Sequence, residues 1–264
     1  MTKTEIKFGP GGFGMPAEEA FPKLEKDDLS AAEIEFTYGV NLTNEESKRL
    51  GELAKKHYIQ LSIHAPYYIN LNAEERQKIF MSKKRILDSC ERAHHMGAKY
   101  VVFHPAFYFK DSKEEVYQRV KKEIESMQQI IKEKGWKIIL APETTGKPSQ
   151  FGDIDELIRL HKETDCFLCI DFAHLKARYN GKVDYNEIFE KLKKNNITKI
   201  QAHFSGIEFT EKGEKKHIPT SKEDWKQILE LFNKHNFSGV IINESPDNWN
   251  DAIKGKKLWD EINK

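Results

Sequence analysis

The sequence predicts a single (β/α)₈ barrel, the TIM-barrel class of α/β folds. Its 264 residues suit one such domain, which usually has about 250. Short apolar runs rich in β-branched and aromatic residues alternate with longer amphipathic stretches rich in Glu and Lys, a pattern typical of βα units around a parallel sheet. We count eight of each kind. Residues 1–264 are therefore expected to form one closed barrel.

The alternation places each element in turn. Strands are predicted at 5–9, 32–37, 59–64, 99–104, 137–143, 166–171, 198–204 and 239–244. Helices are predicted at 16–26, 43–57, 74–97, 113–135, 153–163, 184–196, 221–236 and 249–263. Thr43 and Ser221 stand where a side-chain oxygen can cap the free N–H groups at a helix start. A doubly wound open sheet is the alternative, but the turn after the first strand does not fit the dinucleotide fingerprint.

Composition gives little indication of a partner. The 43 basic and 42 acidic residues are intermixed, and the net charge is +1, so global charge favours neither a nucleic acid nor a membrane. No stretch approaches the roughly 20 apolar residues of a membrane span. We expect a soluble, cytoplasmic monomer with no membrane partner. Three cysteines form no disulfide framework, and we expect Cys166 and Cys169, in an apolar run, to serve packing.

Polar residues fall at the ends of the predicted strands. Because all strands of a parallel barrel end at the same face, which is where this fold places its active sites, these side chains should meet on one rim. A buried carboxylate is costly unless it is paired or bound to a metal, so the convergence favours a site over coincidence. Six strands end in this way, at His64, His104, Glu143, Asp171, His203 and Glu244.

Two further histidines lie close enough in sequence to join this rim. His174 follows Asp171 by three residues, and His217 lies in the long loop after the seventh strand. Five imidazoles and three carboxylates make a donor set that suits Zn²⁺ or Mn²⁺. The remaining histidines fall on predicted helices and are expected to be solvated or packing residues.

Several segments resemble the endonuclease IV family of apurinic/apyrimidinic endonucleases. The resemblance runs through most of the chain and is most specific at His64-Ala65-Pro66-Tyr67-Tyr68-Ile69-Asn70-Leu71, Glu143-Thr144-Thr145-Gly146, Ile170-Asp171-Phe172-Ala173-His174 and His217. It implies a barrel whose zinc ions cut the DNA backbone 5′ to an abasic site in base excision repair. Damaged double-stranded DNA would then be the partner.

The resemblance also implies a role for each rim residue. His64 and His104 would bind one zinc, and Glu143 would bridge it to a second zinc held by Asp171, His203 and Glu244. His174 and His217 would hold a third. Glu143 would also be catalytic, because it would orient the attacking water or accept its proton. Tyr67 and Tyr68 would press against DNA near the lesion, with packing on the rim as the alternative.

The sequence departs from this family in two places. Where the family has an Asp two residues before the loop His, this chain has Lys215. Glu214 or Glu208 would have to reach the third ion instead, or that ion is weak or absent; if it is missing, Lys215→Asp should raise the metal content. The second departure is the segment after the second strand, 36–40, which runs almost directly into a helix and lacks the family's longer loop that enters DNA.

Other functional classes remain open. Glu143, Asp171, His203 and Glu244 also form the pattern of sugar isomerases and epimerases of the same barrel superfamily, in which a single Mn²⁺ or Mg²⁺ binds a ketose. Such an enzyme has no need for His64, His104 and His217, so the nuclease is favoured. A barrel that binds metal or a DNA end without turnover is the third possibility.

Overall fold

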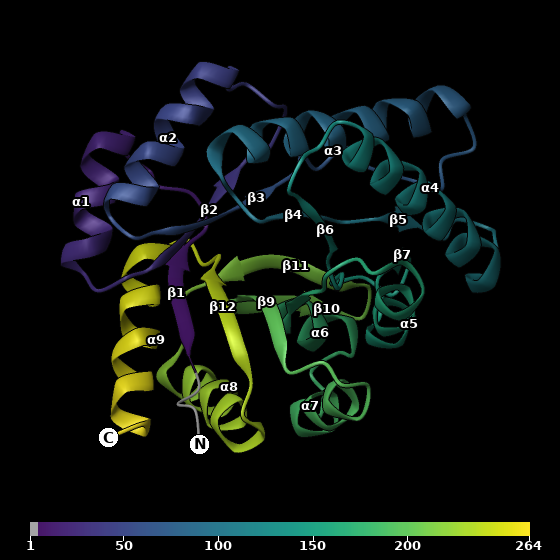
Figure 1. Ribbon diagram of the computed structural model, residues 1–264. Helices are drawn as coiled ribbons and strands as arrows, with labels where there is room; N and C mark the ends of the chain where they lie inside the picture. Colours follow the sequence, from purple (N-terminus) through teal and green to yellow (C-terminus); the bar gives the residue numbers. More distant parts are fainter. Residues whose placement is uncertain (1–4) are drawn as a thin grey trace.

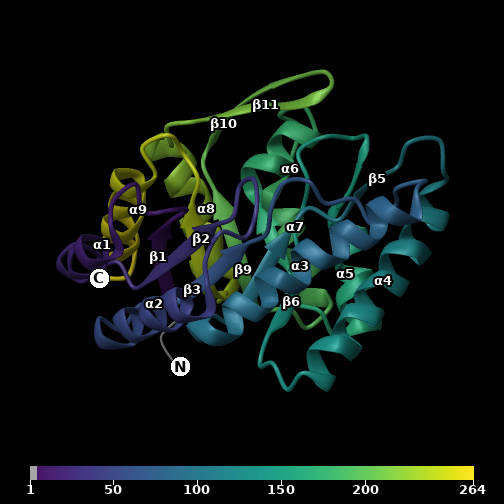
Figure 2. The same ribbon diagram turned by 90° about the horizontal axis from the view of Figure 1, so that it is seen from above.

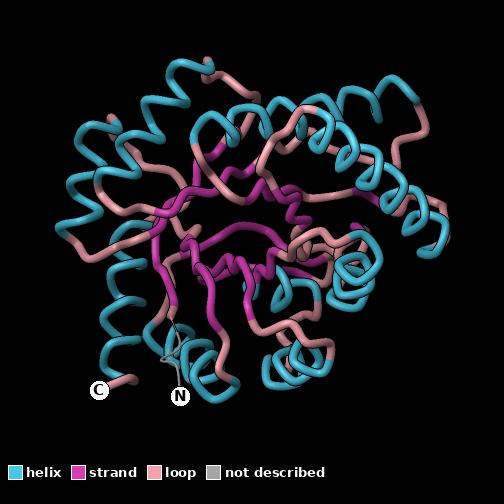
Figure 3. The backbone as a smooth tube through the Cα atoms, viewed as in Figure 1, coloured by secondary structure: helices cyan, strands magenta, loops and turns pink. Residues whose placement is uncertain are grey.

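A computed structural model describes residues 5–264 and shows a ring of parallel strands surrounded by helices (Figure 1; Figure 3). The predicted barrel is therefore confirmed. Each strand lies within a few residues of its predicted position. The barrel strands are β1 (Ile6–Pro10), β2 (Ala31–Glu35), β3 (Gln60–His64), β4 (Tyr100–Phe103), β6 (Ile139–Pro142), β8 (Cys169–Asp171), β9 (Lys199–Phe204) and β12 (Ser238–Asn243).

Strand pairing closes the barrel. One parallel sheet runs in the order β1-β12-β9-β8, and the other in the order β2-β3-β4-β6. Single parallel bridges join them at both seams, from Gly11 to Glu33 and from Glu143 to Cys169. A doubly wound sheet would leave two open edges, so these bridges exclude that alternative.

The predicted helices are all present. They are α1 (Ala17–Lys26), α2 (Asn44–Lys56), α3 (Arg76–Met96), α4 (Lys113–Glu133), α5 (Ile154–Thr164), α7 (Tyr185–Lys194), α8 (Lys222–His235) and α9 (Asn248–Ile262). Both predicted caps are observed, since the Thr43 side chain accepts from the backbone N–H of Glu46 and that of Ser221 accepts from Asp224.

Three features at the C-terminal ends of the strands were not predicted. The short helix α6 (Phe172–Arg178) begins directly after β8, because the Asp171 side chain accepts a hydrogen bond from the His174 N–H and caps it. The segment expected to be a long loop after the seventh strand is the hairpin of β10 (Gly206–Thr210) and β11 (Gly213–Ile218), which projects beyond the barrel (Figure 2). The two-residue strands β5 (Ala106–Phe107) and β7 (Gln150–Phe151) pair in antiparallel fashion.

Apolar side chains pack between the barrel and its helices and hold the strand ends in place. Phe189 of α7 is fully buried and contacts Phe172 and Phe232 at ring-centroid distances of 5.5 and 5.1 Å. Cys166 and Cys169 are free and fully buried, as expected for packing residues. Within residues 5–264, no helix combines the length and apolarity that crossing a membrane would require.

Candidate metal centre

The residues predicted from the strand ends converge on one cavity at the C-terminal face of the barrel. The cavity has a volume of about 440 Å³. Buried or half-buried side chains from separate strands and from the β10–β11 hairpin surround it. Its walls include His64, His104, His174, His217 and Glu244, while Glu143, Asp171 and His203 are fully buried beneath them.

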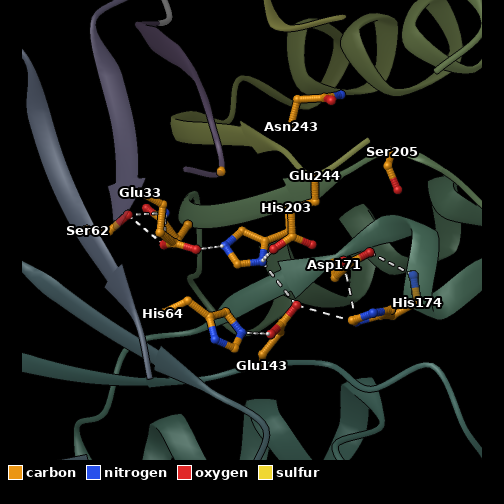
Figure 4. A network of polar contacts seen from close by, with 12 residues as sticks. Glu33, Ser62, His64, Glu143, Asp171, His174, His203, Ser205, Asn243 and Glu244 are labelled. Carbon is orange, nitrogen blue, oxygen red and sulfur yellow. Dashed lines mark hydrogen bonds and ion pairs between the residues drawn. The ribbon is translucent and has the colours of Figure 1, made fainter. Parts of the chain in front are cut away.

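Glu143 lies at the centre of this cluster and faces two groups of imidazoles (Figure 4). Its Oε2 is 3.1 Å from His64 Nε2 and 2.9 Å from His104 Nε2. Its Oε1 is 3.1 Å from His203 Nδ1 and 3.4 Å from His174 Nδ1. The two carboxylate oxygens therefore point to different histidine pairs, an arrangement in which one carboxylate can serve two neighbouring cations.

Glu143 also belongs to a second group with Asp171, His203 and Glu244, whose ligand atoms all lie within 4.8 Å of one another. His203 Nδ1 is 3.1 Å from Glu244 Oε1. Asp171 Oδ2 is buried without a hydrogen-bond partner, whereas its Oδ1 accepts from the His174 N–H. The nearest cationic group to Oδ2 is His174 Nδ1, at 3.4 Å. A buried carboxylate oxygen without a hydrogen bond is costly, so a divalent cation suits this place.

Asp171, His174 and His217 make a third group within the same 4.8 Å limit. His174 is buried at the start of α6, and its Nδ1 lies 2.9 Å from the carbonyl oxygen of Thr144. His217 is on β11, where its Nδ1 lies 2.7 Å from the Ser205 hydroxyl. These contacts fix the two ring planes and turn both Nε2 atoms toward Glu214.

The charges of the cluster are strongly coupled. Burial disfavours the Glu143 carboxylate, but His104 and His203 outweigh that effect and hold its pKa well below the usual range. Burial lowers the pKa of His64, whereas Glu143 and Glu35 raise it more, to about 10. Burial raises the pKa of Asp171 to about 6. The neighbouring carboxylates also raise the pKa of His174 and His203 against burial. Without cations, protons on His64, His174 and His203 thus offset the carboxylates, and a metal ion would displace them.

Two acidic residues of β2 also belong to the cluster, and they were not predicted as site residues from the sequence. Glu33 is fully buried, its Oε1 lies 2.8 Å from His203 Nε2, and its Oε2 accepts a 2.6 Å hydrogen bond from the Ser62 hydroxyl. Glu35 lies one pleat further along, where burial raises its pKa to about 8. The spacing Glu33-x-Glu35 within a strand was the available signal, because alternate residues face the same side.

The two tyrosines proposed to contact DNA are both on the rim. Tyr67 is 57% exposed and lines the cavity. Tyr68 is 61% exposed but is not part of the cavity wall. Their role in binding stays a prediction, with Tyr67 the better placed of the two.

Similar proteins place the chain in a family. Residues 21–262 match the family described as "Xylose isomerase-like TIM barrel". The chain belongs to this family. An uncharacterized protein of Methanocaldococcus jannaschii is 37% identical over 97% of both chains. A "Probable endonuclease 4" of Mycoplasmopsis synoviae is 29% identical, but the alignment spans 52% of this chain and 49% of that protein.

Two solved structures share the fold at low sequence identity. The crystal structure of a D-tagatose 3-epimerase-like protein is 20% identical, with a TM-score of 0.77 over 97% of this chain and 96% of that one. Endonuclease IV from Thermus thermophilus is 19% identical, with a TM-score of 0.72 over 97% of this chain and 98% of that one. Fold similarity alone does not separate a nuclease from an epimerase.

Proposed function

We propose that the chain is a zinc-dependent phosphodiesterase of the endonuclease IV type, which cleaves the DNA backbone 5′ to abasic sites. One observation carries the proposal. The two oxygens of Glu143 face separate imidazole groups, with His64 and His104 on one side and His203 on the other. A carboxylate between two cations is what a multi-metal phosphodiesterase needs, because paired ions stabilise both the attacking and the leaving oxygen.

The donor set fits the proposed cations. His64, His104 and Glu143 would hold the first, and Glu143, Asp171, His203 and Glu244 would hold the second. This assignment gives a ligand role to Asp171 Oδ2, which is buried without a hydrogen bond. Imidazole with carboxylate is a donor set that zinc accepts, and manganese is the alternative. When bound, such ions supply Lewis acids that activate water near neutral pH and stabilise charge on a phosphate.

The chain's own residues then position and polarise the reactants. Glu143, buried between the two imidazole groups, would orient the attacking water or accept its proton. Lys147 lines the same cavity and supplies a positive charge for the backbone of the substrate. Tyr67, exposed at the rim, offers a ring on which an unstacked nucleotide can rest.

A one-cation sugar epimerase is the competing function, and the D-tagatose 3-epimerase-like structure motivates it. Glu143, Asp171, His203 and Glu244 alone would serve such an enzyme. That function leaves His64 and His104 without a role, although both lie within 3.1 Å of Glu143 Oε2. We therefore favour the nuclease.

The test uses a labelled duplex that carries one tetrahydrofuran abasic analogue, with zinc or manganese added. We expect a single nick 5′ to the analogue, no cut in the undamaged duplex, and loss of cleavage in Glu143→Gln. An intact abasic duplex across both metals, with metal shown to be bound, would reject the proposal. Epimerisation of a ketohexose with manganese, followed by NMR, would support the competitor.

A further inference from the structure

The β10–β11 hairpin contains a one-residue irregularity at the place where the sequence departs from the endonuclease IV family. Ile207 pairs with His217 and Glu208 with Lys216, but Phe209 then pairs with Glu214. The register shifts between Glu208 and Phe209, so no residue of β10 pairs with Lys215 across the hairpin. This is a β-bulge, in which one strand carries an extra residue and side chains beyond it are re-aimed.

The bulge exchanges the directions of Glu214 and Lys215. In a regular strand, residues 215 and 217 would share one face and Glu214 would lie on the other. Directly paired residues of an antiparallel hairpin share a face. Because Phe209 and Ile207 lie two residues apart on β10, their partners Glu214 and His217 come to lie on the same face. Alternation along a regular strand would place Lys215 on the same face as His217. The bulge places Glu214 on that face instead.

The side-chain positions agree with this register. The Lys215 side chain is 62% exposed, and its Nζ lies 3.3 Å from Glu208 Oε2. The Glu214 side chain is only 23% exposed and lines the cavity. Its Oε2 is 3.5 Å from His174 Nε2, and its Oε1 is 3.9 Å from His217 Nε2. Of the two carboxylates that the sequence offered, Glu214 therefore reaches the histidines and Glu208 pairs with lysine.

The backbone fixes Glu214 in this place. Its N–H donates a 2.9 Å hydrogen bond to the carbonyl oxygen of Gly146, in the loop after β6. A Cβ atom on Gly146 would lie 2.6 Å from Glu214 Cβ and 3.1 Å from His174 Cδ2, so only glycine permits the close approach. The position of Glu214 is thus set by the hairpin register and by a loop from another part of the barrel.

We propose that Glu214 is the protein carboxylate of a divalent-cation site with His174 and His217, and that the bulge replaces the missing aspartate at position 215. In a tetrahedral zinc site with bonds of about 2.0–2.1 Å, ligand atoms are separated by about 3.3 Å. The two separations around Glu214, 3.5 and 3.9 Å, exceed that value by 0.2 and 0.6 Å. The inference rests on the metal dependence of the proposed function, but not on its DNA substrate.

The test is a metal count in a matched set of variants. Purified wild type, Glu214→Gln, Glu214→Ala, Lys215→Ala and Lys215→Asp are dialysed against buffered free zinc, and separately against manganese, and the bound metal is measured by mass spectrometry. We expect both Glu214 variants to lose one equivalent of metal or to bind it more weakly. Loss of an outer partner of a ligand weakens metal binding roughly 10–100-fold, and loss of a ligand should weaken it more. Both Lys215 variants should match the wild type.

Three results would overturn the inference: a wild type that saturates at two equivalents, a Glu214→Gln protein with an unchanged third equivalent, or a further equivalent in Lys215→Asp. Circular dichroism and the melting temperature verify that each variant is folded. Gly146→Ala gives an independent readout, because its Cβ would displace Glu214 and should lower the same affinity. No DNA enters these measurements, so failure of the nicking assay alone would reject the substrate and leave the metal site standing.

Discussion

Glu33 offers a direct test of how the barrel prepares His203 for a metal ion. Its Oε1 lies 2.8 Å from His203 Nε2, on the opposite side of the ring from Nδ1, which faces Glu143 and Glu244. A ligating imidazole typically donates its other N–H to such a carboxylate, which fixes the tautomer and raises its basicity. Replacing Glu33 should therefore weaken metal binding without removing a ligand.

The size of the effect follows from the place of Glu33 behind the His203 ring, 2.8 Å from the nitrogen that faces away from the cluster. Loss of such an outer partner of a ligating histidine typically weakens metal binding about 10–100-fold. Glu33→Gln should therefore weaken the most sensitive zinc equivalent by about 10–100-fold. Ser62→Ala, which removes a donor to the same carboxylate but keeps the carboxylate, is the matched control and should weaken zinc binding less than Glu33→Gln does.

Zinc affinity is measured by competition with a chromophoric chelator at several pH values. Because the carboxylate favours the correct tautomer, the Glu33→Gln deficit should persist at the pH where His203 is neutral in both proteins. Equal zinc affinities for wild type and Glu33→Gln would refute this account of His203. A Ser62→Ala loss as large as the Glu33→Gln loss would refute the assignment of the effect to the carboxylate.

Three further predictions concern stability. Burial lowers the pKa of His64, but Glu143 and Glu35 raise it more, from 6.5 to about 10 in the folded protein. The protonated His64 therefore stabilises the fold below about pH 6.5, and this stabilisation is lost as the pH rises through 10. The melting temperature of chelator-treated protein should fall over that window, and less so in His64→Asn; a flat wild-type profile would contradict this. Phe189→Ala empties a fully buried site and should cost about 3–5 kcal/mol in urea unfolding, with unchanged metal content; a loss below about 1 kcal/mol would be inconsistent with the packing. Arg178→Ala removes a donor to the carbonyls of Lys147 and Gln150, at 2.7 and 2.9 Å. It should cost about 1–3 kcal/mol and speed hydrogen exchange of that loop. Unchanged exchange would contradict the role.

The rim could be predicted from the sequence because one geometric rule governs it. All strands of a parallel barrel end at the same face, so residues as distant in sequence as His64 and Glu244 can be placed together from strand position alone. The structure brings them into one cluster with Glu143 at its centre. The identity of the bound metal, and the assignment of each ligand to it, stay predictions.

Glu33 was within reach of the same reasoning but lies one pleat below the strand end. Alternate residues of a strand face the same side, so Glu33 faces the barrel interior together with Glu35, the last residue of β2. Its full burial depends on Ser62 and His203 from neighbouring strands. The sequence gives the direction of such a side chain but not the partners that make its burial tolerable.

The sequence offered Glu214 and Glu208 as carboxylates for the third ion, but the sequence alone could not choose between them. The direction of Glu214 depends on a one-residue shift in the pairing of β10 with β11, and a shift of one residue turns every side chain to the other face. Position 215, two residues before His217, holds a lysine. For this reason Lys215→Asp was expected to raise the metal content if the third ion were missing. The proposed role of Glu214 leads to the opposite expectation, which the metal count tests. The short helix α6 was missed for a related reason, since Asp171 is at once a cluster residue and a helix cap.

The central claim is that Glu143 lies between two cations. Anomalous scattering at the zinc edge, from crystals grown with zinc, tests it directly. We expect one peak about 2.0–2.2 Å from each oxygen of Glu143, the first beside His64 and His104 and the second beside Asp171, His203 and Glu244, in addition to the peak proposed beside Glu214. A single peak among Glu143, Asp171, His203 and Glu244, with none beside His64 and His104, would contradict it and favour the one-cation epimerase.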